Sequence, residues 1–251
     1  MKTKKGDTKM IIKEANYVET FTLNDAWRDA MWLCVMNGWD FVVKEGSYKG
    51  QIRKQLPYVT IKVKGPGTRP LAPMLSPPNE PPTTEEKIKE YFHNYLMSDV
   101  IHGNEQYTYG SFIKPQLMKV IELLVEAKGN TNQARIAIGD RDSVFLTDPP
   151  CLNTINFKVV EKKLVMSVVF RSWDLFSGLP QNLGGLQMLK EFVLEFIQTE
   201  FEVQDGPLVA FSDGLHLYEY AFELADMLNV EKVEVSKEAM EDKNEFAKTL
   251  G

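Results

Sequence analysis

Cysteine is scarce in this sequence, because its 251 residues include only Cys34 and Cys151. Two thiols are too few for the disulfide framework of a small secreted domain, and their wide separation does not resemble a zinc site. We therefore expect reduced thiols in a cytosolic protein, and no metal.

Long hydrophobic runs are also missing. The basic segment 1–10 is followed by Ile11, Ile12, Lys13 and Glu14, without an apolar stretch long enough for a signal peptide or a membrane span. No internal repeat with a period of roughly 20 to 50 residues is visible, which argues against solenoids and propellers. We expect a soluble, cytoplasmic protein with no membrane partner.

Basic residues are in the minority, with 29 Lys and Arg against 35 Asp and Glu and a net charge of −6. Such a balance disfavours broad electrostatic binding to a nucleic-acid backbone. We expect no nucleic-acid partner, while a local basic pocket for a small anion remains allowed.

The chain has enough apolar sequence for a full core, since 43% of its residues are hydrophobic and 25% are charged. We expect a single domain over 1–251, with two small domains as the alternative that this length also permits. Seven of the thirteen prolines lie between Pro66 and Pro82. Because proline disrupts both helices and central strands, we expect a loop or an extended surface arm at about 65–83.

Hydrophobic periodicity predicts a mixture of helices and strands. Helical spacing occurs over 24–36, with Asn24 as the expected cap, then from Thr84, and over 116–127, 186–197 and 217–228. Strand patterns occur at 58–63, 134–138, 157–160, 164–170 and 208–211. The short turn at 161–163 favours an antiparallel hairpin. The expected fold class is α+β, a mixed and largely antiparallel sheet with helices packed on one face.

Cys151 follows Pro149 and Pro150, which fix the backbone just before a predicted strand. It is a candidate nucleophile, although a free cysteine is commonly a small buried hydrophobic residue. Cys34 lies on an apolar helical face between Leu33 and Val35, so we expect it to belong to the core.

Two further clusters carry polar side chains at strand ends. Arg171 and Ser172 follow an apolar strand and offer a guanidinium and a hydroxyl that suit a phosphate, although a surface ion pair is the common alternative. His216 and Tyr218 flank an apolar residue. Alternation along a strand would point both polar groups to the same side.

In this order, the three clusters resemble the signature of the thymidylate synthase family. The matching elements are the cysteine after Pro-Pro, the run at 171–182 with the pattern R-S-x-D-x-x-x-G-L-P-x-N, and the H-x-Y element at 216–218. The resemblance covers about 134–228 and is closest to the divergent archaeal forms, including those of methanogens. The element Tyr107-Thr108-Tyr109-Gly110 also looks like a family motif. A thymidylate synthase-like fold is the expectation that follows.

The resemblance implies a thymidylate synthase-like methyltransferase in which the Cys151 thiolate adds to C6 of dUMP. C5 then takes a one-carbon unit from a methylenetetrahydrofolate-type donor, which gives dTMP. A nearby Arg171 would lower the pKa of the thiol.

By resemblance, Arg171 and Ser172 hold the 5′ phosphate, together with Arg135 supplied in trans by the partner of a homodimer. Arg53 matches a further phosphate arginine loosely, with an exposed strand charge as the alternative. His216 and Tyr218 would bind the ribose 3′ hydroxyl. Asp174 is expected among the catalytic and substrate-binding residues, and Tyr109 among the substrate-binding ones.

Asn182 is expected to select the base, because a carboxamide can accept from N3–H and donate to O4 of uracil. That favours dUMP over dCMP. The family relays protons through a glutamate on a helix before the Tyr-Gly element, and Glu90 is the candidate here, with a solvated surface glutamate as the alternative. Glu85 and Glu86 are expected to cap the helix.

The sequence departs from the family pattern at three places. Leu152 and Phe170 replace the common histidine and glutamine, and 246–251 lack the hydrophobic tetrapeptide that closes over the folate. A methanopterin analogue is therefore an alternative to the folate as the reduced pterin co-substrate. Two other functions compete: a hydroxymethylase acting on dUMP, dCMP or CMP, and a non-catalytic nucleotide-binding regulator.

Overall fold

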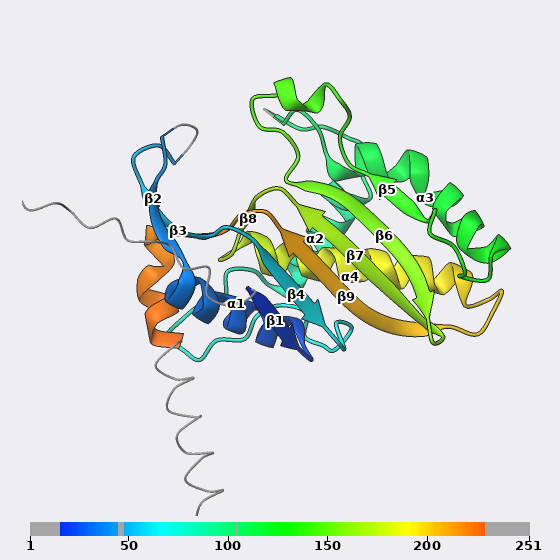
Figure 1. Cartoon of the computed structure of the whole chain (residues 1–251), viewed down its shortest axis with the longest axis horizontal. Coiled ribbons are helices and arrows are strands. Elements are labelled where there is room, and N and C mark those ends of the chain that lie inside the picture. Colours follow the sequence, from blue (N-terminus) through cyan, green and yellow to red (C-terminus); the bar gives the residue numbers. More distant parts are fainter. Residues whose placement is uncertain (1–15, 45–47, 104, 229–251) are drawn as a thin grey trace, which may run out of the picture.

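The computed structural model describes residues 16–44, 48–103 and 105–228, and two sheets organise them (Figure 1). The larger sheet has six strands in the order β1-β4-β9-β7-β6-β5. Their bounds are β1 (Tyr17–Thr20), β4 (Val59–Val63), β5 (Arg135–Ala137), β6 (Leu152–Val160), β7 (Lys163–Phe170) and β9 (Gln204–Ser212). The pairs β1–β4 and β7–β9 are parallel, and the other neighbours are antiparallel. The expected mixed, largely antiparallel sheet is thus confirmed.

The predicted hairpin is confirmed as β6 and β7. Glu161 and Lys162 at its tip have φ values of 51° and 59°, and positive φ at both central positions matches the twist of a tight hairpin. Strand β6 begins at Leu152, earlier than predicted, because Asn153 and Asn156 interrupt the apolar pattern of its first half. Cys151 therefore lies directly before the first residue of β6.

Helices cover one face of the larger sheet. In Figure 1, α1 and α4 lie behind it, and α2 packs on α4. Their bounds are α1 (Leu23–Asn37), α2 (Glu85–Tyr91), α3 (Tyr109–Glu126) and α4 (Gly178–Ile197), with shorter turns η1 (Phe92–Leu96), η2 (Ser143–Phe145) and η3 (Glu219–Ala221). Within the described ranges, no helix is both long and apolar enough to cross a membrane.

Several predicted helix ends are wrong. The cap of α1 is Thr22, whose hydroxyl accepts from the backbone N–H of Asp25 at 3.1 Å. The side-chain Oδ1 of Asn24 instead accepts from the backbone N–H of Met74. Helices α3 and α4 begin earlier than predicted, because Pro115 and the glycines at the start of α4 resemble loop residues in sequence.

The helix predicted over 217–228 is also wrong at its start. Leu217 and Tyr218 belong to strand β10, and the helical segment follows only after η3.

A second, four-stranded sheet has the order β2-β3-β10-β8. Its strands are β2 (Trp39–Val42), β3 (Ile52–Leu56), β8 (Trp173–Asp174) and β10 (Leu215–Tyr218). Register places Tyr218 opposite Arg53 and His216 opposite Asp174. This sheet, which the sequence patterns did not predict, brings four candidate site residues to one place.

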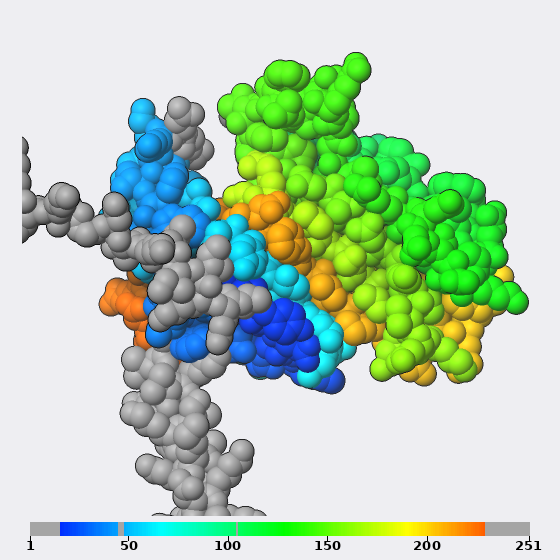
Figure 2. Space-filling view, in the orientation of Figure 1, coloured from blue at the N-terminus to red at the C-terminus, as the bar shows by residue number. Residues whose placement is uncertain are grey.

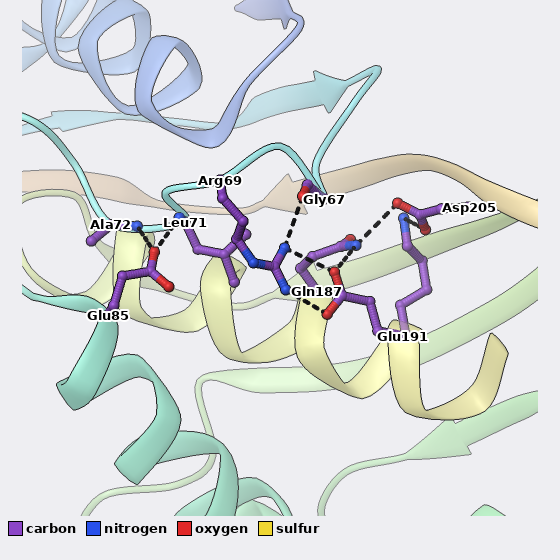
Figure 3. A network of polar contacts seen from close by, with 9 residues as sticks. Gly67, Arg69, Leu71, Ala72, Glu85, Gln187, Glu191 and Asp205 are labelled. Carbon is purple, nitrogen blue, oxygen red and sulfur yellow. Dashed lines mark hydrogen bonds and ion pairs between the residues drawn. The ribbon is translucent and has the colours of Figure 1, made fainter. Parts of the chain in front are cut away.

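The proline-rich segment forms no helix or strand over 66–82, as expected, but it packs on the protein and is not a free arm. Leu71 is buried, and Arg69 forms a two-pronged ion pair with Glu191 of α4, with N–O distances of 2.9 and 2.7 Å (Figure 3). Glu85, the expected cap residue, instead accepts from the backbone N–H groups of Leu71 and Ala72. The segment is thus held against α2 and α4.

Candidate active site

A cleft of about 480 Å³ lies where the two sheets meet. Figure 2 shows the surface hollowed between the β2–β3 hairpin and the segment that carries η2. The cleft is lined by Val43, Tyr48, Arg53, Thr147, Asp148, Cys151, Arg171, Ser172, Asp174, His216 and Tyr218. The three sequence clusters therefore meet in one cavity, as predicted.

Arg171 lies beside Cys151 because β6 starts where β7 ends. The backbone N–H of Arg171 donates to the backbone carbonyl of Cys151 at 2.8 Å. The Arg171 side chain then turns back onto the Pro-Pro turn, with Nε donating to the Pro150 carbonyl at 3.0 Å and Nη2 donating to the Pro149 carbonyl. The Arg171 side chain thus stabilises the Pro149–Pro150 turn that precedes Cys151. The remaining N–H groups of its guanidinium are available to a ligand.

The pKa of the Cys151 thiol is raised from its ordinary value, with burial as the largest cause. Arg171 lowers this pKa, as the sequence predicted, but Asp148 raises it. The predicted effect of the arginine is therefore confirmed, although burial outweighs it and the net pKa is raised. Cys34 belongs to the core as predicted, and burial raises its pKa to about 12.

The opposite wall is built by β3 and β10. Arg53 is half-buried, with its guanidinium carbon 4.7 Å from the Phe41 ring centroid, and its buried Nε has no hydrogen-bond partner among the described residues. It is therefore not the exposed strand charge that the sequence left open. Because Arg53 lines the cleft, its guanidinium adds a positive charge that favours an anionic ligand.

His216 and Tyr218 both line the cleft from β10, so the predicted alternation is confirmed. His216 is buried, and burial, followed by the charge of Arg53, lowers its pKa to about 4. The imidazole is therefore neutral near pH 7 and can donate one hydrogen bond and accept another.

Asp174 lines the cleft, but its carboxylate is already engaged. It accepts from the Ser177 hydroxyl at 2.7 Å and from the backbone N–H groups of Ser177 and Gly178 at 3.1 and 2.9 Å. These donors lie at the start of α4, so Asp174 caps that helix. The arrangement suits a positioning residue better than a proton carrier.

Asn182 does not line the cleft among the described residues, and its carboxamide is bound on both sides. Oδ1 accepts from the Trp173 indole N–H, and Nδ2 donates to the Tyr91 hydroxyl, each at 2.9 Å. Asn182 is half-buried, and its partner Trp173 is buried and stands in the sequence between the cleft residues Ser172 and Asp174.

Glu90 does not line the cleft, so its position does not support its predicted role as the proton relay. Its side chain is exposed, whereas Ile88 and Tyr91 form the face of α2 that packs on α4. Successive helical residues point about 100° apart, so Tyr91, and not Glu90, faces α4, where its hydroxyl accepts from Asn182 Nδ2.

Tyr109 is buried beside the thiol segment, where its hydroxyl accepts from the Leu152 N–H at 3.1 Å. Arg135 is exposed on the edge strand β5, and its Nε donates to the Thr154 hydroxyl at 3.0 Å. It does not line the cleft of its own chain.

A second hollow of about 600 Å³ lies beside the cleft, and the sequence patterns did not predict it. It is lined by Tyr95, Glu105, Gln106, Tyr107, Thr147 and Asp148, and the last two residues also line the cleft. The tyrosine-rich segment 91–109 was the available signal. Aromatic walls of this kind suit a flat heterocycle.

Comparison with known proteins agrees with this architecture. The profile of the family described as thymidylate synthase matches residues 110–248. A Methanosarcina barkeri protein named "Putative thymidylate synthase" is 25% identical over 215 residues, covering 83% of this chain and 92% of its own. A thymidylate synthase of Buchnera aphidicola is 25% identical over 130 residues, covering 50% of this chain and 47% of its own.

The fold is also similar to that of the solved thermostable thymidylate synthase A from Bacillus subtilis, with a TM-score of 0.63 and 15% identity over 83% of this chain and 84% of that one. Because the profile covers more than half of the sequence, the chain belongs to the thymidylate synthase family. Membership indicates an enzyme of the methyltransferase type, with a nucleotide substrate and a methylenetetrahydrofolate-type co-substrate.

Proposed function

We propose that this protein is a thymidylate synthase that converts dUMP to dTMP, with Cys151 as the nucleophile. The observation that carries the proposal is the placement of the Cys151 thiol in one cleft with Arg53, Arg171 and Ser172. Two arginines and a hydroxyl can hold a phosphate dianion by charge-assisted hydrogen bonds. A phosphate anchored there would place the pyrimidine near the thiol.

In the proposed reaction, the Cys151 thiolate adds to C6 of the uracil ring, and C5 becomes the nucleophile. Arg171 favours the thiolate because it lowers the pKa of Cys151. His216 and Tyr218 would hydrogen-bond the ribose 3′ hydroxyl, while Asp174 would fix the start of α4. Tyr109 would hold the backbone that follows the nucleophile through its contact with Leu152.

The reduced pterin fits the second hollow, where Tyr95 and Tyr107 offer aromatic surfaces next to the cleft. When bound, this co-substrate supplies the one-carbon unit and the reducing equivalent. The shared pterin ring would fit whether the donor is a folate or a methanopterin.

We also propose that two copies of the chain assemble with Arg135 completing the partner's phosphate site. Arg135 is exposed at a sheet edge and points to no site in its own chain. The face of the larger sheet that carries no helices in Figure 1 has half-buried apolar side chains, including Val165, Val169, Val209 and Phe211. Such a face suits an isologous interface.

Replacement of the nucleophile tests the proposal. Cys151→Ser should abolish turnover of dUMP while the nucleotide dissociation constant changes by less than about tenfold, because other residues hold the phosphate and the base. The measurement is turnover combined with calorimetry, with Cys34→Ala as the matched control that keeps turnover. Turnover retained in Cys151→Ser would remove Cys151 from the mechanism.

A further inference from the structure

The direction in which Asn182 presents its carboxamide is fixed by its neighbours. Trp173 is 2% exposed and stacks on Phe170, with ring centroids 4.1 Å apart and planes 6° apart. An indole N–H can only donate, so the carboxamide atom 2.9 Å from it must be the acceptor Oδ1. On the other side, Nδ2 is left to donate to the Tyr91 hydroxyl.

Tyr91 is also held in place. A Cβ on Gly185 would lie 2.6 Å from the Tyr91 ring, so this ring packs directly against the α4 backbone. Tyr95 stacks on the other side, with ring centroids 5.6 Å apart. Both partners of the Asn182 carboxamide are therefore rigid groups within the packed protein.

An asparagine without such partners does not by itself select a base. With Oδ1 toward N3 it accepts from the N3–H of uracil and donates to O4. After a half-turn of its amide it donates to the unprotonated N3 of cytosine and accepts from the 4-amino group. In this protein the half-turn would set an amide N–H against the Trp173 N–H, which leaves two buried donors facing each other.

We propose that Trp173 is a specificity-determining residue, whose donor-only indole N–H prevents the half-turn of the Asn182 amide and so restricts the site to uracil-type bases. The two hydrogen bonds use one lone pair and one N–H of the carboxamide, which leaves one of each for the base. The inference rests on the proposed function, since it takes a pyrimidine nucleotide as the ligand.

The test compares dUMP and dCMP dissociation constants by calorimetry in the full chain. Trp173→Phe keeps an aromatic ring on Phe170 and removes the N–H. It should lower the preference for dUMP by about tenfold, mainly through tighter dCMP binding. Trp27→Phe is the matched control, because Trp27 is another buried indole whose N–H donates once, to the Phe176 carbonyl at 3.1 Å. It should leave the preference unchanged.

A second pair of variants keeps the test decisive if Trp173→Phe does not fold. Trp173→Met also removes the indole N–H while it keeps an apolar side chain in the buried position, and it too should lower the preference by about tenfold. Tyr91→Phe removes the other contact of the carboxamide and should not change the preference, because a hydroxyl can serve either orientation of the amide.

An unchanged preference in folded Trp173→Phe, or in folded Trp173→Met, overturns the proposal. If the unmodified protein binds neither nucleotide, the proposed function itself fails. If the unmodified protein binds dUMP selectively and the Trp173 variants leave the ratio of the dUMP and dCMP dissociation constants unchanged, only the proposed role of Trp173 fails.

Discussion

At the scale of single residues, the reactivity of Cys151 depends on opposing influences. Burial and the Asp148 carboxylate favour the neutral thiol, and the Arg171 guanidinium favours the thiolate. Asp148 lies 3.5 Å from Arg171 at an exposed position, so it also competes for the cation that the thiol uses. Removing the Asp148 charge should therefore lower the pKa of Cys151, and removing the Arg171 charge should raise it.

We predict that alkylation of Cys151 by iodoacetamide is slow near pH 7 and accelerates as the pH rises through the raised pKa of the thiol, because only the thiolate reacts. Asp148→Asn should shift the profile to lower pH and increase the rate at pH 8 by about two- to threefold, since this carboxylate is exposed and solvent-screened. Arg171→Gln should shift the profile to higher pH. Mass spectrometry identifies the alkylated residue.

Cys34 provides the internal control for this measurement. It is fully buried and its pKa is raised to about 12, so it should stay unmodified in the folded protein. A shift of the Asp148→Asn profile toward higher pH would contradict the assignment of charges around Cys151.

The resemblance places Arg171 near Cys151, whereas the predicted hairpin does not, because its first strand is expected to begin only at 157 and β6 begins at Leu152. Sequence could not show that Asp174 caps α4, since capping depends on where the helix starts. Nor could it distinguish Glu90 from Tyr91. The side of α2 that meets the site is decided by packing against Gly184 and Gly185, which lie far away in the sequence.

At the scale of elements, the close packing of α2 on α4 positions the base-reading carboxamide. Gly185 lets the Tyr91 ring approach the α4 backbone, and Gly184 does the same for Ile88. Sequence patterns treated the start of α4 as a loop because of these small residues and Pro180. The four-stranded sheet was missed for another reason: its strands are short, and β8 has only two residues, too few for a recognisable alternation.

We predict that Gly185→Ala destabilises the protein by about 1–3 kcal/mol, because its new methyl group would overlap the Tyr91 ring. The same change should displace Tyr91 and, with it, the Asn182 carboxamide from the Trp173 N–H, and so lower the preference for dUMP over dCMP. Urea unfolding and calorimetry measure the two effects.

Gly184→Ala is the matched control for that variant. Its methyl group would meet Ile88, which has no contact with the carboxamide, so it should alter stability without altering base preference. Equal changes of base preference in both variants would show that the effect does not pass through Tyr91.

At the scale of the whole molecule, we propose that the active site is shared between two copies of the chain, with Arg135 contacting the phosphate in the partner's cleft. Arg135 lies on β5 at the edge of the larger sheet, away from the cleft of its own chain. A charge-assisted contact of this kind typically contributes about 1.5–3 kcal/mol.

We predict that Arg135→Ala lowers nucleotide affinity by about tenfold to a hundredfold, and that mixing it with Cys151→Ser restores activity. One site in each mixed dimer would combine an intact Cys151 with an intact partner Arg135. Lys158→Ala, which changes an exposed cation on β6, should remain active alone. A mixture that stays inactive although subunits exchange, or a fully active monomer, would contradict the shared site.

The central claim is that the cleft converts dUMP to dTMP, and the most direct measurement is the product formed from dUMP with methylenetetrahydrofolate. The same protein is tested separately with dCMP, and Cys151→Ser is the blank. We predict dTMP from dUMP, little product from dCMP and none from the blank. Formation of a 5-hydroxymethyl nucleotide, a preference for dCMP, or nucleotide binding without any product would contradict the account.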